Sequence, residues 1–462
     1  MTHLHWFRED LRLEDNPAFQ HQLPDAALYI YDESLIGDAQ KIWLHFSLQA
    51  LEKSLKKHLI PLIIAQGEPH EVWSKLLKKY QLQKVTWNQS YNPAVFSHDE
   101  KVKHLIEEKS IQVETFSGSL LLSPEILLTQ SGGFYKVFTP FWEAHQKIYE
   151  IPQKPSRLKS PQHPANIPSS SLENLGLLKN PVISIEQFQK EWCPGEEGAL
   201  SQLQSFIRHS LKTYAHDRDI PALGKTSRLS PHLHFGEISP QTIAREIHKL
   251  PSQPYLRELV FRDFANYLLF HCPDLPHTPF KKEFSKWKWS DDIAHFNAWK
   301  KGKTGYPLID AGMRELYETG FMHNRVRMVV ASFLIKDLNI SWQKGAAWFL
   351  ERLLDADVAN NSFNWQWSAG TGLDAQPYFR IFNPELQSEK FDSEGIYIRK
   401  WVPELTKLPD KYIHAPWKAP EEILRKAGIR LGKDYPSPIV DHNQAKKWAL
   451  EQFQKIKKLS SH

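Results

Sequence analysis

The sequence predicts an α/β N-terminal domain with a Rossmann-like parallel sheet, followed by an all-α C-terminal domain. The chain has 462 residues, which is more than a single hydrophobic core usually supports. Residues 1–130 alternate short apolar runs with amphipathic stretches, as strand–helix–strand units of a parallel sheet do. From residue 198 to residue 462 the apolar spacing is helical almost throughout, which predicts a helical domain.

Four apolar runs in the N-terminal domain are expected to be buried strands, because they are short and continuous. Between two of them, Trp43, Phe46 and Leu51 fall on one face of the stretch from Trp43 to His58, which predicts a helix. No Gly-x-Gly-x-x-Gly string occurs, so a dinucleotide site in this domain has no support. The expected strands are Leu4–Phe7, Leu28–Tyr31, Pro61–Ile64 and Lys84–Trp87.

Residues 131–197 are expected to be an interdomain linker, because Pro, Ser, Gln and Lys are frequent there and the periodicity is weak. Two helix starts follow in the helical domain. Ser230 before Pro231 and Ser239 before Pro240 each have the form of an N-cap serine followed by a first-turn proline.

The composition is 41% hydrophobic and 24% charged, and no run of about 18 apolar residues offers a membrane span. The N-terminus has no secretion signal, and Cys193 and Cys272 are too few and too scattered for a disulfide framework or a zinc site. We therefore expect a cytoplasmic protein without membrane contact or bound metal. The net charge of +5 mildly favours a polyanionic partner. The 16 Trp, 15 Tyr and 25 Phe exceed ordinary packing needs.

Most of the polar and aromatic motifs lie between Gly302 and Glu385. His323–Met328, Asp355–Asn361 and Trp365–Trp367 bring arginines, carboxylates, amides and indoles into one helical segment. These side chains suit a buried, charged, redox-active aromatic cofactor. The segment therefore indicates a flavin enzyme. The characteristic motifs of hydrolases and of nucleoside triphosphatases are absent from the sequence.

Two motifs upstream have a functional and an ordinary interpretation. Thr226–Ser230 ends at an expected helix start, so its hydroxyls and backbone N–H groups suit a phosphate, or the serine simply caps the helix. Glu258, Phe261 and Arg262 share one face of an expected helix. That face either joins a stacking surface to polar recognition or holds an exposed Glu–Arg pair.

Further residues of the dense segment are also open to two interpretations. Asn324 stands above Met328 on an expected helix, but a lone Met is usually core filler. Asp355 and Asp357 are costly to bury unpaired, and the candidate partners are Arg327 and Arg262. The spacing cannot reveal whether three indoles meet, and the default is that they fill the core; they are Trp289, Trp342 and Trp365.

Taken in order, these motifs resemble those of the DNA photolyase and cryptochrome family, most closely the class I photolyases that repair cyclobutane pyrimidine dimers. Trp6–Asn16 is similar to the family's opening strand and turn, Tyr135–Pro140 to its mid-chain marker, and residues 214–405 to its flavin domain. The resemblance implies an antenna domain, a wrapping linker, and a helical domain that holds FAD in a folded conformation.

The resemblance also implies roles residue by residue. The cofactor's phosphates and ribityl chain are expected at Tyr214, Thr226, Ser227, Arg228, Leu229 and Ser230, with Tyr255 in the same cofactor-binding set. The isoalloxazine is expected beside Arg262, Asn324, Arg327, Asp355 and Asp357, with Asn361 facing flavin N5. The damaged DNA is expected at Arg218, Glu258, Phe261, Asn324, Met328 and Trp367. The electron relay that photoreduces the flavin is expected along Trp365, Trp342 and Trp289.

The implied activity is that of a deoxyribodipyrimidine photo-lyase. Light excites reduced FAD, an electron passes to a flipped-out dimer, the cyclobutane ring splits, and the electron returns. Glu258 is expected to stabilise the dimer radical anion, and Asn361 the reduced flavin. Asn324 stands where (6-4) photolyases have a second histidine after His323, which disfavours that substrate. We expect a monomer that binds DNA containing pyrimidine dimers; the alternative is a blue-light-sensing cryptochrome with FAD but no repair activity.

Two positions depart from the family pattern. Phe261 stands where dimer-repairing relatives usually have a tryptophan, and a phenyl ring offers less stacking area and no N–H. Ala94 and Val95 align near the Asn–Glu pair that holds folate in some relatives. Neither Ala94 nor Val95 recognises a pterin by charge, so either another antenna chromophore binds or none does, and its identity stays open.

Overall fold

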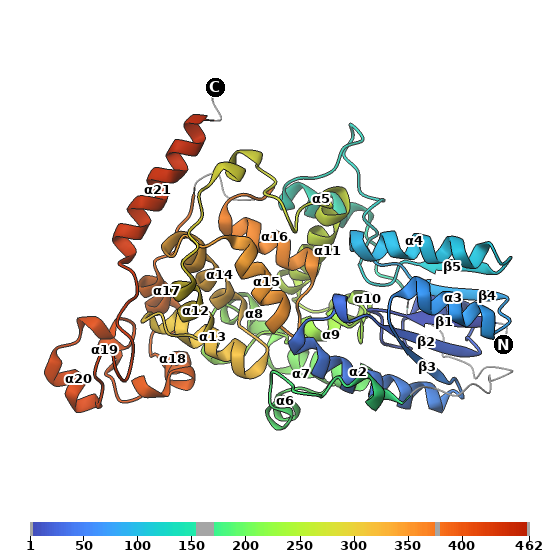
Figure 1. Ribbon diagram of the computed structural model, residues 1–462, viewed down its shortest axis with the longest axis horizontal. Helices are drawn as coiled ribbons and strands as arrows, with labels where there is room; N and C mark the ends of the chain where they lie inside the picture. The colour runs from blue at the N-terminus through green and yellow to red at the C-terminus, as the bar shows by residue number, and fades with distance from the viewer. Residues whose placement is uncertain (1–2, 154–170, 375–378, 460–462) are drawn as a thin grey trace. The chain divides into compact units, whose positions relative to one another are not determined.

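The computed structural model describes residues 3–153, 171–374 and 379–459. The predicted fold class is confirmed, because a parallel five-stranded sheet lies in the N-terminal part and helices dominate the C-terminal part (Figure 1). No helix of the described ranges is both long enough and apolar enough to cross a bilayer. The chain divides into two compact units: unit 1 comprises residues 1–212, 227–273 and 354–360, and unit 2 comprises residues 213–226, 274–353 and 361–462.

The sheet of unit 1 has the strand order β3-β2-β1-β4-β5, and every neighbouring pair is parallel. Crossovers between parallel strands of one sheet are right-handed. The helix α2, between β2 and β3, therefore lies on one face of the sheet, and α3 and α4, which precede and follow β4, lie on the other face (Figure 1). The core under α3 and α4 centres on Trp6, whose ring centroid lies 5.7 Å from that of Trp73 and 5.6 Å from that of Trp87. The strands are β1 (His3–Phe7), β2 (Ala26–Tyr31), β3 (Leu62–Gln66), β4 (Lys84–Asn88) and β5 (Gln112–Phe116).

The four predicted strands and the predicted helix over 43–58 are present, whereas β5 was not predicted. Ser239 caps α10 by accepting from the Thr242 backbone N–H, as predicted. The same prediction for Ser230 is wrong, because Leu229 is the N-cap of α9 and Ser230 is its first residue. The helices of unit 1 are α1 (Pro17–His21), α2 (Asp38–Lys57), α3 (Pro69–Lys79), α4 (Pro93–Glu107), α5 (Phe138–Ile148), α6 (Ile185–Glu191), α7 (Glu196–His209), α9 (Ser230–His234), α10 (Pro240–Ile247) and α11 (Gln253–His271).

The segment predicted as a linker carries α5 and α6, and its residues 154–170 lie outside the described residues. Phe141 on α5 packs on Phe264 and Tyr267 of α11, with ring centroids 4.9 Å apart in both cases. These aromatic contacts include α5 in the core of unit 1. The division into domains 1–130, 131–197 and 198–462 stays a prediction.

Unit 2 is organised around a buried carboxylate. Asp310 on α13 accepts hydrogen bonds from the Thr304 and Gly305 backbone N–H groups, from the Thr304 hydroxyl and from Tyr435. The Gly302–Pro307 motif therefore forms the turn before α13. The helices in unit 2 are α8 (Tyr214–Asp217), α12 (Ile293–Lys300), α13 (Pro307–Thr319), α14 (Asn324–Ser332), the π-helical turn η6 (Phe333–Asp337), α15 (Trp342–Arg352), α16 (Val358–Ala369, which begins in unit 1), α17 (Pro384–Phe391), α18 (Ile396–Trp401), α19 (Asp410–Ile413), α20 (Glu421–Ala427) and α21 (His442–Leu459).

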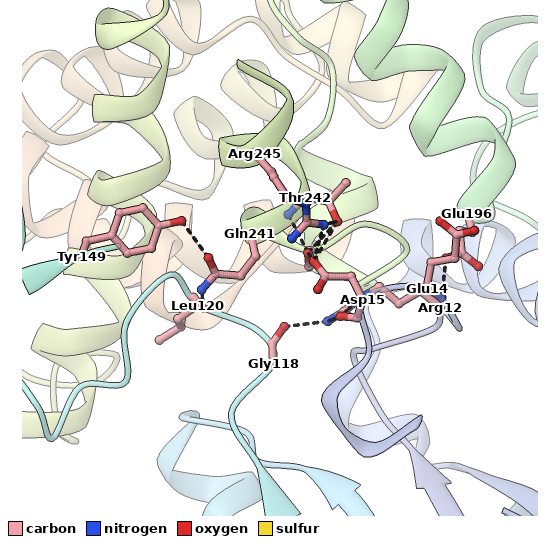
Figure 2. A network of polar contacts seen from close by, with 11 residues as sticks. Arg12, Glu14, Asp15, Gly118, Leu120, Tyr149, Glu196, Gln241, Thr242 and Arg245 are labelled. Atoms are coloured by element: carbon pink, nitrogen blue, oxygen red, sulfur yellow. Dashed lines mark hydrogen bonds and ion pairs between the residues drawn. The ribbon is translucent and has the colours of Figure 1, made fainter. Parts of the chain in front are cut away.

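Within unit 1, the loop after β1, residues 8–16 and hereafter the β1 loop, joins the sheet to helices distant in sequence (Figure 2). The buried Arg12 donates to the carbonyl oxygens of Gly236 (3.0 Å) and Gly118 (2.8 Å). Asp15 accepts from Ser239, from Thr242 (2.8 Å) and from Arg245 on α10 (3.2 Å). The carboxyl edge of the sheet is thereby bound to α9 and α10.

Two further carboxylates hold the β1 loop by hydrogen bonds, one from α7 and one within the loop. Glu196 at the start of α7 accepts from the backbone N–H groups of Leu13 (3.2 Å) and Glu14 (2.8 Å). Burial raises the pKa of Glu196 to about 7. Asp10 accepts from Asn88 at the end of β4 (2.6 Å). The loop is thus hydrogen-bonded on both sides.

Gly236 permits this close approach. Its φ is +64°, and a Cβ there would lie 2.1 Å from the Glu9 carbonyl oxygen. We expect Gly236→Ala to lower the free energy of unfolding by about 3 kcal/mol, because overpacking costs about 1–3 kcal/mol and the left-handed backbone about 1 kcal/mol more. Denaturant unfolding measures it. Gly176→Ala is the matched control, because Gly176 has φ +62° and nothing within 4 Å; equal losses in both variants contradict the crowding argument.

Candidate functional site

The backbone of Thr226–Ser230 has the shape of an anion site. Arg228 adopts a left-handed φ of 54° and Leu229 a right-handed conformation, with φ −89° and ψ −5°. Consecutive residues of opposite hand turn their N–H groups toward one side, which forms an anion-binding concavity. Ser230 is the first residue of α9 and not its N-cap, so the capping interpretation of this motif loses its main support.

The side chains around this loop hold it in place. Ser227 hydrogen-bonds with Tyr255, and its carbonyl oxygen accepts from Gln202 (2.8 Å). The Arg228 guanidinium lies 4.1 Å from the centroid of the Trp192 ring and forms an ion pair with Glu191 (3.1 Å). Ser227 Oγ also accepts from the Leu229 backbone N–H (3.3 Å), so the loop is held by its own hydrogen bonds, and the arginine stabilises it from the side.

Glu258, Phe261 and Arg262 lie half-buried on α11, as the helical spacing predicts. The Phe261 ring stacks on Phe138 of α5, with centroids 3.4 Å apart and planes at 7°. The guanidinium of Arg257 lies 4.9 Å from the Phe138 centroid and 5.9 Å from that of Phe261. The sequence did not single out Phe138 or Arg257 for this role.

Arg262 is bonded to backbone. It donates to the carbonyl oxygens of Ser119 (2.5 Å) and Leu233 (3.5 Å). It therefore joins α11 to the strand-following loop and to α9, in addition to any contact with a cofactor.

Asn324, Arg327 and Met328 lie on α14 in unit 2. Asn324 is exposed, and Arg327 and Met328 are half-buried, so Met328 is not simply core filler. Arg327 donates to the Met322 carbonyl oxygen (2.7 Å). His323 caps the helix through Nδ1, which accepts from Arg325 N–H (3.2 Å). Burial lowers the pKa of His323 to about 4, which keeps it neutral.

The carboxylate and amide of the Asp355–Asn361 segment are oriented by hydrogen bonds. Asp357 accepts from the backbone N–H and the side-chain amide of Asn360, both at 2.7 Å. The Asn361 Nδ2 donates to the Ala346 carbonyl oxygen on α15 (3.0 Å). Because the nitrogen side of the Asn361 amide is bonded there, its oxygen is the side left to accept from a ligand N–H.

The three indoles predicted to form the relay lie in unit 2, on α15, on α16 and on the segment that pairs just before α15. Trp365 occupies the space over Gly345, where a Cβ would lie 2.2 Å from its ring, and Gly345 stands one turn after Trp342. Ser290, the neighbour of Trp289, pairs with Ile340 just before α15. Trp365 and Trp342 are 2% and 1% exposed, whereas Trp289 is half-buried, as a path from core to surface requires.

Of the predicted residues, those in unit 1 are Ser227, Arg228, Leu229, Ser230, Tyr255, Glu258, Phe261, Arg262, Asp355 and Asp357. Those in unit 2 are Tyr214, Arg218, Thr226, Trp289, Asn324, Arg327, Met328, Trp342, Asn361, Trp365 and Trp367. Arg218 in unit 2 lies over Tyr214, its guanidinium 5.3 Å from the ring centroid. Trp367 is half-buried on α16. The roles of all these residues stay predictions.

The chemistry of these groups fits FAD. A concave row of backbone N–H groups with neighbouring hydroxyls suits a pyrophosphate. An amide whose nitrogen is already bonded suits a flavin ring N–H through its oxygen, and an indole packed on the helix that holds this amide suits electron transfer to the ring. Each group is positioned by the chain's own hydrogen bonds.

Comparison with known proteins gives the class. Residues 3–162 match the DNA photolyase family model, and residues 255–455 match the model of the FAD binding domain of DNA photolyase. A deoxyribodipyrimidine photo-lyase of Agrobacterium fabrum is 46% identical over 98% of both chains. The crystal structure of a class III photolyase from Agrobacterium tumefaciens is 44% identical, with a TM-score of 0.91 over 99% of this chain and 98% of that one. A cryptochrome structure from Synechocystis is 31% identical, with a TM-score of 0.88 over 97% of this chain and 98% of that one.

The chain belongs to the DNA photolyase and cryptochrome family. It is a flavoprotein with FAD as its cofactor, and the prediction of a photo-lyase enzyme is confirmed. The expected nearness to class I enzymes stays a prediction, since a class III enzyme is among the similar structures. The identity of an antenna chromophore stays open.

We expect Trp365→Phe to abolish photoreduction of the bound FAD by an external reductant, because phenylalanine is too hard to oxidise to serve as the first relay member. Absorbance of the flavin under illumination measures it. Trp299→Phe is the control, since the Trp299 ring packs against Trp365 at 6.4 Å in the same core. Equal loss of photoreduction and of repair by chemically reduced protein means that Trp365 is structural.

Proposed function

We propose that this protein repairs cyclobutane pyrimidine dimers in DNA with light, by electron transfer from photoexcited reduced FAD to a flipped-out dimer. The observation that carries the proposal is the stacked pair of Phe138 and Phe261, one helical turn from Glu258. A fixed aromatic face beside a carboxyl group suits a splayed pair of bases. Several of the similar proteins are named deoxyribodipyrimidine photo-lyases.

The stack compensates in part for the absence of a tryptophan at position 261. Phe138 is 2% exposed and covers one face of Phe261, so the plane of Phe261 is set before a base arrives. Its other face is the one that a lesion base would meet. Base–aromatic stacking contributes about 1–3 kcal/mol per base, and a ring already held in place loses little entropy on binding.

The remaining residues serve the same reaction. Bound FAD supplies the light-driven electron and takes it back. Glu258 is assigned the role of stabilising the radical anion of the dimer. Asn361 accepts from the ring N–H that distinguishes reduced from oxidised flavin, because its amide nitrogen is bonded to Ala346. Arg257 and Arg218 are assigned to DNA phosphates, with the salt dependence that such contacts carry.

A single assay tests the function. Protein reduced with dithionite is mixed with ultraviolet-damaged oligothymidylate, and dimers are counted after near-ultraviolet illumination and after an equal time in the dark. The proposal expects dimers to disappear only in the light. Unchanged dimers, with FAD still photoreduced, favour the blue-light-sensing cryptochrome.

Phe261 is the most informative site for affinity. We expect Phe261→Ala to weaken binding of damaged oligothymidylate about tenfold or more, the loss of one stacked base, and Phe261→Trp to tighten it. Fluorescence anisotropy measures both. Phe46→Ala is the control, because Phe46 is also half-buried and stacked, on Phe188 at 5.6 Å. Unaltered affinity in Phe261→Ala contradicts a stacking role.

A further inference from the structure

A row of three indoles begins at Trp289, the outer member of the predicted relay. The Trp287 ring lies 5.6 Å from the Trp289 ring between centroids, with the two planes at 34°. The Trp448 ring on α21 lies 6.3 Å from that of Trp287, at 83°. Both separations are those of aromatic rings in packing contact. Electrons pass readily between rings in contact, because the rate of transfer falls steeply with the gap between them.

The row ends at an exposed side chain. Trp287 is 6% exposed and Trp448 is 38% exposed, so the row leads from a buried indole to one that water and dissolved reductants reach directly. Two further rings touch Trp287, and both are phenylalanines: Phe284 at 6.2 Å and Phe379 at 5.7 Å. Phenylalanine is too hard to oxidise to take part. Among the described rings that contact Trp287, the outward donor is therefore Trp448.

The N–H of Trp287 has a fixed partner that takes up no proton. Its Nε1 donates to Asn339 Oδ1 (2.9 Å), and Asn339 Nδ2 in turn donates to the Lys288 carbonyl oxygen (3.1 Å). The two bonds orient the amide with its oxygen toward the indole. An amide oxygen accepts a hydrogen bond and stabilises positive charge on the ring, but it is not a base. An oxidised Trp287 therefore stays a radical cation, which is able to take an electron from Trp448.

The helix that carries Trp448 is fixed on both sides of this residue. Asp337 at the end of η6 pairs with His442 at the start of α21, with 2.5 Å between Oδ1 and Nδ1. Phe453, further along α21, stacks on Phe379 with centroids 4.6 Å apart. Trp448 lies between these two anchors, so its contact with Trp287 is built into the packing of α21.

We propose that the electron relay continues past Trp289 through Trp287 and ends at Trp448, which makes Trp448 the surface donor that refills the relay from solution. The inference rests on the predicted relay of Trp365, Trp342 and Trp289, which prepares FAD for the proposed function. A longer row carries the positive charge further from the cofactor. The charge then returns more slowly, and a reductant in solution has more time to reach it.

Electrons and protons balance along this row. Bound FAD supplies the light-driven oxidising power and takes up one electron. Trp287 gives one electron to Trp289 and receives one from Trp448, so both inner indoles return to their starting state. Trp448 is left one electron short, and its N–H releases a proton to water, which leaves a neutral radical. A thiol in solution returns one hydrogen atom, and two thiol radicals formed in this way combine to a disulfide.

The first test measures a distance in holoprotein with oxidised FAD. Pulsed electron paramagnetic resonance gives the separation of the two unpaired electrons that a light flash produces. We expect a longer separation in the wild type than in Trp448→Phe or Trp287→Phe, because in these variants the positive charge stops at an inner indole. Trp417→Phe is the matched control and keeps the wild-type separation, since Trp417 is a half-buried indole of unit 2 that packs on Tyr306 at 5.1 Å.

The second test follows the tryptophan radical by transient absorption. In Trp448→Phe and Trp287→Phe we expect its lifetime to fall about tenfold, the effect of a barrier to charge return that is lower by about 1.4 kcal/mol. Photoreduction by a dilute thiol slows in the same two variants but persists, whereas Trp365→Phe abolishes it. Circular dichroism verifies that each variant folds.

A packing role alone predicts a different result. Trp287 and Phe379 belong to one hydrophobic cluster with residues of α21, and a substitution that only loosens this cluster leaves the radical at the same distance. Equal separations in the wild type, Trp448→Phe and Trp287→Phe therefore overturn the inference. A wild-type radical in Trp365→Phe overturns the predicted relay and the inference with it. Dimer repair by chemically reduced protein is measured on the same samples, so its absence together with the expected separations counts against the proposed function alone.

Discussion

The structure of unit 1 depends on a buried arginine, Arg12, whose hydrogen bonds within the described part of the chain all go to carbonyl oxygens. Arg12 is 2% exposed and donates to carbonyl oxygens of Asp15, Gly118 and Gly236. Withdrawal from water lowers its pKa, so each of these carbonyl groups compensates part of the desolvation. The sheet, its last loop and the end of α9 are consequently held in one arrangement.

The α/β part lacks a glycine-rich nucleotide motif. The backbone predicted to hold the phosphates lies at Arg228 and Leu229, just before α9, whose far end closes on the β1 loop at Gly236. α9 is five residues long, too short for a strong helix dipole. A phosphate site at this turn would therefore depend on its backbone N–H groups rather than on a helix dipole.

Sequence patterns predicted the continuous apolar strands and the aromatic-rich helices, because burial alone determines those patterns. β5 escaped prediction because it is an edge strand without a fully buried residue, and it includes the polar Gln112 and Glu114. The backing of Phe261 by Phe138 joins positions 123 residues apart in the chain, and no local spacing encodes such a pair. The N-cap of α9 is Leu229, one residue before the predicted Ser230, because the left-handed backbone of Arg228 turns the chain into the helix one residue earlier.

The hydrogen bond between Asn361 and Ala346 restricts what this position is able to carry. An aspartate there has no N–H, so an ionised carboxylate would face a carbonyl oxygen across about 3 Å and be repelled. It would have to bind a proton or rotate away. Ala346 belongs to the same helix as Trp342 and Gly345. A change at position 361 that displaces Ala346 would therefore also displace the helix on which Trp342 and Trp365 pack. Position 361, predicted to face the flavin, and the tryptophans predicted to carry electrons to it are therefore linked through α15. A substitution at one of these positions would also affect the other.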